Sequence, residues 1–192
     1  MALRFGNSWR VLLLLAAALG AFRAIARAKE EDDDLVRRVV ILANASSDES
    51  LKLARYYAQR RAIPEENIVA LPMTLAETIG WREFVDTVYQ PLQDELVRRG
   101  WIDATGSDLK DSVGRKKYAV LGHRMSYLAV CRGVPLRVDH DQALYVEMSP
   151  LMNSAFKTNH GAVDAELALV VRSGYPINAY RCCSDYCVSL LT

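Results

Sequence analysis

The stretch that decides the fold runs from Tyr127 to Asp141 and reads YLAVCRGVPLRVDHD. It begins with an apolar run rich in β-forming residues, is interrupted at Gly133 and cannot continue as a helix through Pro135. We therefore predict a buried central strand over 127–131, whose carboxyl end brings the charged residues after it into one neighbourhood. Ligands of open α/β sheets bind at the carboxyl ends of the strands, so we expect a site there.

The segments before this stretch predict an α/β domain. The apolar runs 38–43 and 67–71 predict two strands, and the segment between them predicts a helix with Ser47 as its N-cap and an end near Pro64. A strand–helix–strand unit favours a parallel pair of strands. We expect a three-layer α/β sandwich with a mainly parallel sheet of the Rossmann or flavodoxin type.

Further patterns complete the expected element order. Residues 81–99 predict a helix that is kinked or broken near Gln90, because a proline follows inside the pattern. The polar, glycine-containing segment 102–114 predicts a loop, and 117–121 predicts a small β-arm before the central strand. A last helix is expected over 162–172.

Residues 1–28 predict a secretory signal peptide. Arg4 and Arg10 form the positive region, 11–22 is an apolar segment, and small residues around an arginine predict cleavage after Ala28. The apolar segment is too short for a comfortable membrane span, although an uncleaved amphipathic anchor is the alternative. We expect a secreted or periplasmic protein with no stable membrane span after cleavage.

Charge and composition limit the partners of the cleaved chain. Removing residues 1–28 deletes four arginines and no acid, so the formal charge falls from +1 to −3. No basic stripe is visible, so nucleic acid is not an expected partner. We divide the rest of the chain into an acidic linker at 29–37, an α/β domain at 38–180 and an atypical tail at 181–192 that holds three of the four cysteines.

Three motifs carry a resemblance. They are YYAQRRAIPEENI at 56–68, CRGVPLR at 131–137 and GAVDAEL at 161–167. Over about 39–180 the chain resembles an uncharacterised family of secreted bacterial proteins with a signal peptide and an α/β domain. The resemblance transfers no catalytic residue. Members of that family are longer and continue with further sheet, which implies that the domain is incomplete here and that residues from Arg181 onward are not native family sequence.

The polar residues after the predicted central strand suggest a hydrolytic site. The candidate catalytic residues are His140, His160, Asp164 and Glu166. The candidate ligands of a divalent metal such as Zn²⁺, whose bound water becomes a nucleophile near neutral pH, are Asp139, His140, Asp141 and His160. Their spacing matches no standard zinc motif. We expect His140, His160 and Asp164 to share one pocket, which the segment up to Lys157 covers.

Two other kinds of site are open. Cys131 and His160 could form a thiolate–imidazole pair distantly similar to caspase- and gingipain-like peptidases, although their order in the chain is reversed and the apolar run favours a core cysteine. Arg132 and Arg137 could bind a carboxylate or phosphate, or pair with the neighbouring aspartates. The sequence favours a binding or structural protein, with a metal-dependent or cysteine-peptidase-like secreted hydrolase as the alternative.

Overall fold

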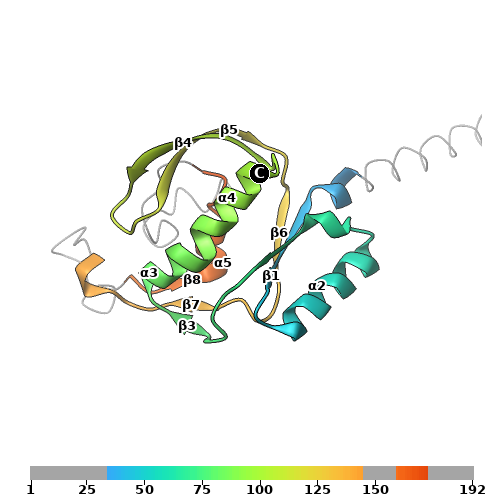
Figure 1. The fold of residues 1–192 in the computed structure, drawn as a ribbon, viewed down its shortest axis with the longest axis horizontal. Coiled ribbons are helices and arrows are strands. Elements are labelled where there is room, and N and C mark those ends of the chain that lie inside the picture. The colour runs from blue at the N-terminus through green and yellow to red at the C-terminus, as the bar shows by residue number, and fades with distance from the viewer. Residues whose placement is uncertain (1–33, 145–158, 173–192) are drawn as a thin grey trace, which may run out of the picture.

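The computed structural model describes residues 34–144 and 159–172 (Figure 1). The predicted signal peptide and its cleavage point, most of the covering segment and the tail 181–192 lie outside the described residues. Within the predicted linker, residues 34–37 form a helical turn, and an Arg38–Asp34 ion pair of 3.8 Å spans it.

A parallel three-stranded sheet confirms the α/β class. Its order is β2 (Ile68–Leu71), β1 (Val39–Asn44) and β6 (Tyr127–Val130), and β1 is parallel to both neighbours. The expectation that 127–131 forms the central strand is wrong, because β1 is the middle strand of the three. The cause lies in burial: β1 is buried along nearly its whole length, whereas Tyr127 of β6 is 59% exposed.

Side chains of β1 alternate between two apolar clusters. Ile41 and Ala43 pack with Ala54 and Ala58 of α2 (Asp48–Arg61). Val40 and Leu42 belong to a second cluster, which contains side chains of the helical segment that begins at Trp81. The two clusters therefore lie on opposite sides of β1.

The ends of α2 agree with the sequence pattern. Ser47 is the N-cap, and its hydroxyl accepts a 3.2 Å hydrogen bond from the Ser50 N–H. The helix ends at Ala62, which adopts the left-handed conformation with φ of 54°. A 3₁₀ turn, η1 (Glu65–Asn67), then leads into β2.

The helix predicted over 81–99 is present and irregular. It consists of α3 (Trp81–Phe84), a π-helical segment η2 (Val85–Tyr89) and α4 (Gln90–Arg98). The irregularity expected near Gln90 is this π segment: Pro91 lacks an N–H and its ring disturbs the preceding turn, so the helix widens there. Its inner face supplies the fully buried Phe84, Val88, Leu92 and Leu96.

The prediction of a loop over 102–114 is wrong. Strand β4 (Ile102–Lys110) pairs antiparallel with β5 (Lys116–His123), and the hairpin arches past α4 in Figure 1. The polar sequence concealed the strand because, apart from Ile102, its residues are half-buried or exposed. Cross-strand pairing and contact with the helix compensate, and Tyr118 Oη donates a hydrogen bond to Asp94 Oδ1.

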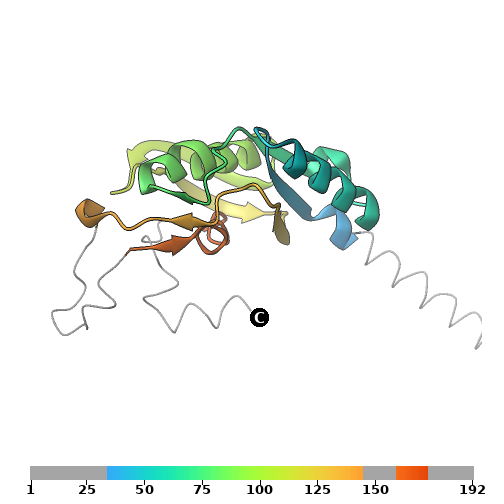
Figure 2. The ribbon, with the colours of Figure 1, turned by 90° about the horizontal axis from the view of Figure 1, so that it is seen from below.

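A small second sheet was not predicted. Strand β7 (Arg137–Val138) lies between β3 (Thr78–Ile79), which is parallel to it, and β8 (Gly161–Ala162), which is antiparallel. A 3₁₀ turn, η3 (Gln142–Leu144), comes after β7. The last helix is shorter than the predicted 162–172: α5 spans Val163–Leu167. Figure 2 shows α5 beneath α4, where Gln93 Nε2 donates to the Val170 carbonyl at 3.2 Å.

Candidate functional site

The carboxyl end of the parallel sheet, where the sequence predicts a site, is filled by the chain itself. Asn44 is fully buried, and its Nδ2 donates to the carbonyls of Gly133 at 2.7 Å and Thr74 at 3.1 Å. Gly133 has φ of +97°, and a Cβ there would lie 3.1 Å from Ser50 Cβ. The backbone after β6 therefore packs directly on the first turn of α2. Arg132, on this turn, is exposed.

His140 and His160 come together at the second sheet. Their ring centroids are 5.6 Å apart, and His160 Nδ1 lies 3.4 Å from Asp139 Oδ1. His140 follows β7 and His160 precedes β8, so the pairing of these two short strands brings the imidazoles together. Both histidines were candidates from sequence.

Asn159 holds His140 and Asp141 in place, and sequence reasoning missed it. Its Oδ1 accepts a 2.7 Å hydrogen bond from the Asp141 N–H, its Nδ2 donates to the Asp141 carbonyl at 2.8 Å, and its own N–H lies 3.1 Å from His140 Nδ1. Its carbonyl accepts from Trp81 Nε1 at 3.0 Å. The other ring nitrogen of His140 is 3.1 Å from Gln142 Oε1. Both ring nitrogens of His140 thus already contact protein atoms.

Two open cavities flank the histidines. One, of about 510 Å³, is lined by Arg137, Asp139 and His160 among others. The other, of about 350 Å³, is lined by Asp139, His140 and Asp141 together with residues of β3 and α3. Asp139 lines both cavities. The structure therefore brings four other predicted residues close to its carboxylate, namely Arg137, His140, Asp141 and His160.

Asp164 and Glu166 are not part of this neighbourhood. Asp164 is exposed, lines neither cavity, and its Oδ1 accepts from the Ala165 N–H at 2.8 Å. Glu166 is only 2% exposed and its Oε2 lies 3.9 Å from Nη1 of the buried Arg115. The two carboxylates, two positions apart on a helix, face different surroundings, and Glu166 belongs to the interior beneath the hairpin.

The described part of the structure does not confirm the four predicted metal ligands. Within the described residues, no group of three or more histidine, cysteine or acidic side chains is arranged to hold a metal ion. The aspartates instead accept backbone hydrogen bonds: Asp139 Oδ1 from the His140 N–H at 2.8 Å, and Asp141 Oδ1 from the Ala143 N–H at 2.9 Å. Binding of a divalent metal stays a prediction.

Cys131 is a core residue. It packs with Ile41 and Ala43 beneath α2, and burial raises the pKa of its thiol. A nucleophilic cysteine needs the opposite shift, produced by a cationic neighbour and solvent access. The geometry gives no support to the pair of Cys131 with His160.

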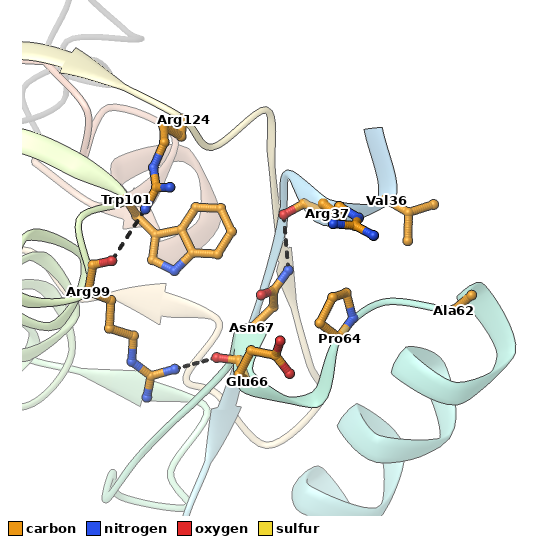
Figure 3. Close-up of a pocket in the computed structure, with 9 residues that line it drawn as sticks. All are labelled: Val36, Arg37, Ala62, Pro64, Glu66, Asn67, Arg99, Trp101 and Arg124. Atoms are coloured by element: carbon orange, nitrogen blue, oxygen red, sulfur yellow. Dashed lines mark hydrogen bonds between the residues drawn. The ribbon is translucent and has the colours of Figure 1, made fainter. Parts of the chain in front are cut away.

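A groove of about 740 Å³ lies at the amino end of the parallel sheet (Figure 3). Its lining residues are Val36, Arg37, Ala62, Pro64, Glu66, Asn67, Arg99, Trp101 and Arg124. Sequence reasoning missed this groove because its residues come from four separate segments. The dipeptides that supply two of its three arginines, Arg98-Arg99 and His123-Arg124, end α4 and β5 and carry no motif.

Two arginines of the groove are held by main-chain carbonyls. Arg99 Nη1 donates to the carbonyls of Glu66 at 2.6 Å and Ile68 at 3.1 Å. Arg124 Nε donates to the Gly100 carbonyl at 2.9 Å, and its guanidinium carbon lies 5.7 Å from the centre of the Trp101 ring. Both side chains are therefore fixed before any ligand arrives.

Glu95 forms an ion pair with Arg99. Its carboxylate accepts hydrogen bonds from Arg98 Nη2 and from Arg99 Nε, each at 2.6 Å. The hydrogen bond from Arg98, opposed by burial and reinforced by Arg99, lowers the pKa of Glu95 to about 2. Glu95 is therefore a carboxylate at neutral pH and holds Arg99 in place.

Comparison of the chain with protein-family models, curated proteins and solved structures finds no match. The resemblance to the secreted bacterial family therefore stays a prediction. Among the helices of the described part of the chain, none combines the length and the apolar character that a membrane crossing needs.

Proposed function

We propose that the chain is an exported bacterial protein whose α/β domain binds a ligand, in the periplasm or outside the cell, with no nucleic acid as partner. The observation that carries the proposal is the groove of Figure 3, in which arginine side chains are fixed by main-chain carbonyls around an open volume. Concave sites with a few fixed polar groups are the usual form of a small-ligand site.

The proposal includes a three-layer sandwich of the Rossmann or flavodoxin type. Its support is the pair of apolar clusters on opposite sides of β1, one with α2 and one with α4. Export rests on the signal-peptide pattern of residues 1–28. Both parts are independent of the groove.

A secreted hydrolase is the second candidate. One observation favours it: His140, His160 and Asp139 meet between two cavities, and an imidazole beside a carboxylate is a common general base. Against it stands His140, whose two ring nitrogens contact Asn159 and Gln142. His160 would then have to carry the proton transfer.

A paired screen separates the two candidates. The purified chain is tested against a panel of small metabolites by thermal shift, and against generic ester, peptide and phosphate-ester substrates for turnover. We expect at least one ligand to raise the melting temperature, since binding to the native state alone stabilises it, and no turnover. Turnover that disappears in His160→Ala but persists in the exposed control Asp164→Ala would replace the binding proposal with the hydrolase.

A further inference from the structure

We infer that the groove at the amino end of the sheet binds a small oxyanion that carries two or more carboxylate or phosphate groups. The inference rests on the proposed binding function and adds the site and the chemical class of the ligand. Three features of the groove carry it: its charge, the way its arginines are fixed, and their separation.

The groove concentrates positive charge in a chain that is nearly neutral. Arg37, Arg99 and Arg124 contribute three guanidinium groups and Glu66 one carboxylate, so the lining carries a formal charge of +2. The whole chain carries only +1. Glu95, which does not line the groove, forms ion pairs with both Arg98 and Arg99. The three side chains together have a net charge of +1. Such a concave cationic surface attracts anions.

The fixed arginines leave donor groups for a ligand. Arg99 uses Nε and Nη1 for Glu95 and for two carbonyls, and Arg124 uses Nε and Nη2 for the carbonyls at the end of α4. The remaining nitrogen of each guanidinium is not needed for these contacts. Because the side chains are already ordered, little rotamer entropy is lost when an oxyanion accepts their hydrogen bonds.

Arg37 is the third cation, and no described residue neutralises it. Within 34–144 and 159–172 its side chain makes no hydrogen bond or ion pair, while its carbonyl accepts from Asn67 Nδ2 at 3.1 Å. The backbone that carries Arg37 is therefore held by Asn67, which also lines the groove, and the guanidinium is exposed. An exposed arginine without a partner among the described residues is the group that an anionic ligand would engage.

The three arginines lie on two sides of the groove. Figure 3 shows Arg37 on the side of Val36, and Arg99 and Arg124 across from it with Trp101 between them. One compact monovalent anion cannot meet cations on opposite walls, whereas an anion with separated charged groups can. The volume of about 740 Å³ is in the range of small-molecule sites.

The experiment is isothermal titration calorimetry on the purified full chain at constant ionic strength. The probes are citrate for polycarboxylates and inorganic pyrophosphate for phosphates, with acetate as the monovalent control. The variants are Arg37→Gln and Arg124→Gln. The matched control is Arg132→Gln, which removes an exposed arginine at the other end of the same sheet.

We expect citrate or pyrophosphate, but not acetate, to bind, and each groove variant to weaken binding about tenfold or more, as for a lost charge-assisted hydrogen bond. Arg132→Gln should leave the affinity unchanged. Whichever probe binds identifies the charged group. Arg37→Gln keeps the test valid even if Arg124→Gln disturbs folding, because the Arg37 side chain makes no hydrogen bond or ion pair within the described residues.

Two results overturn the inference. Either neither probe binds, or all three variants weaken binding equally, as expected for nonspecific attraction that salt screens. If a metabolite from the screen still binds while the groove variants leave its affinity unchanged, the oxyanion site is wrong and the binding function stands. If no metabolite binds and turnover is found, the binding function fails.

Discussion

The two ends of the parallel sheet differ in how closely the adjoining backbone packs against them. At the carboxyl end, the backbone at Gly133 packs on α2 and is tied to Asn44, so the end is filled. At the amino end, Asn67 also donates hydrogen bonds from its side chain to two main-chain carbonyls, those of Arg37 and Val39. A groove nevertheless lies beside it. The end of the sheet that topology favours for ligands is closed here, because the chain after the strand returns over it.

The largest expected effect is at the filled end. Asn44→Ala removes four side-chain hydrogen bonds, two donated to carbonyls and two accepted from the N–H groups of Ser46 and Met73. Buried groups without partners cost about 1–3 kcal/mol each, so we expect a loss of about 3–5 kcal/mol in the free energy of unfolding, measured by urea denaturation.

The control for Asn44→Ala is the amino-end Asn67→Ala, which removes two hydrogen bonds and should cost about 1–2 kcal/mol. Equal losses of unfolding free energy in the two variants would contradict the view that the carboxyl end of the sheet is more closely packed than the amino end.

A smaller effect is expected at Gly133. Its φ of +97° and the 3.1 Å approach of a Cβ to Ser50 both oppose a side chain. Gly133→Ala should therefore reduce the free energy of unfolding by about 2 kcal/mol. Gly114, whose φ is +95° with open space around it, provides the control for backbone strain alone. If Gly133→Ala costs no more than Gly114→Ala, close packing at the carboxyl end is not the cause.

The smallest effect concerns pH at the open end. The pKa of Glu95 is lowered to about 2 in the folded chain from an ordinary 4.5, so its ion pairs stabilise the fold above about pH 4.5, and this stability is lost as pH falls towards 2. Because the side chain is partly exposed, we expect about 1 kcal/mol. Denaturation of wild type and Glu95→Gln at pH 7 and pH 3 measures it. A variant as stable as wild type at pH 7 would contradict the assignment.

Local patterns predicted α2, the helix from Trp81 and the parallel pairing of β1 with β2, and they missed strands whose partners lie far along the chain. The Ser47 cap, the end of α2 and the irregular helix from Trp81 depend on neighbours in sequence, and all three were correct. The order of strands and the hairpin at 102–123 depend on partners far along the chain. A polar strand with one face in solvent has the composition of a loop, so periodicity alone did not reveal it.

The candidate site shows the same limit. His140 and His160 were predicted together because His140 follows a predicted strand and the turn at His160 leads into a helix expected to pack on the same sheet. Their rings lie 5.6 Å apart. Glu166 was misplaced because its burial beside Arg115 depends on the hairpin, which the sequence did not predict. Asn159 and the groove arginines act through main-chain carbonyls, and such contacts leave no residue pattern.

Trp101 in the groove gives the open end its own optical signal. Its ring is half-buried beneath the Arg124 guanidinium, whereas Trp81 is 1% exposed and donates to the Asn159 carbonyl beside the histidines. The third tryptophan, Trp9, lies in the predicted signal peptide. Trp101 therefore fluoresces from a partly solvent-exposed site and Trp81 from a buried one. A water-soluble quencher reaches Trp101 and not Trp81. Occupation of the groove would shield Trp101 from the quencher and leave the emission of Trp81 unchanged.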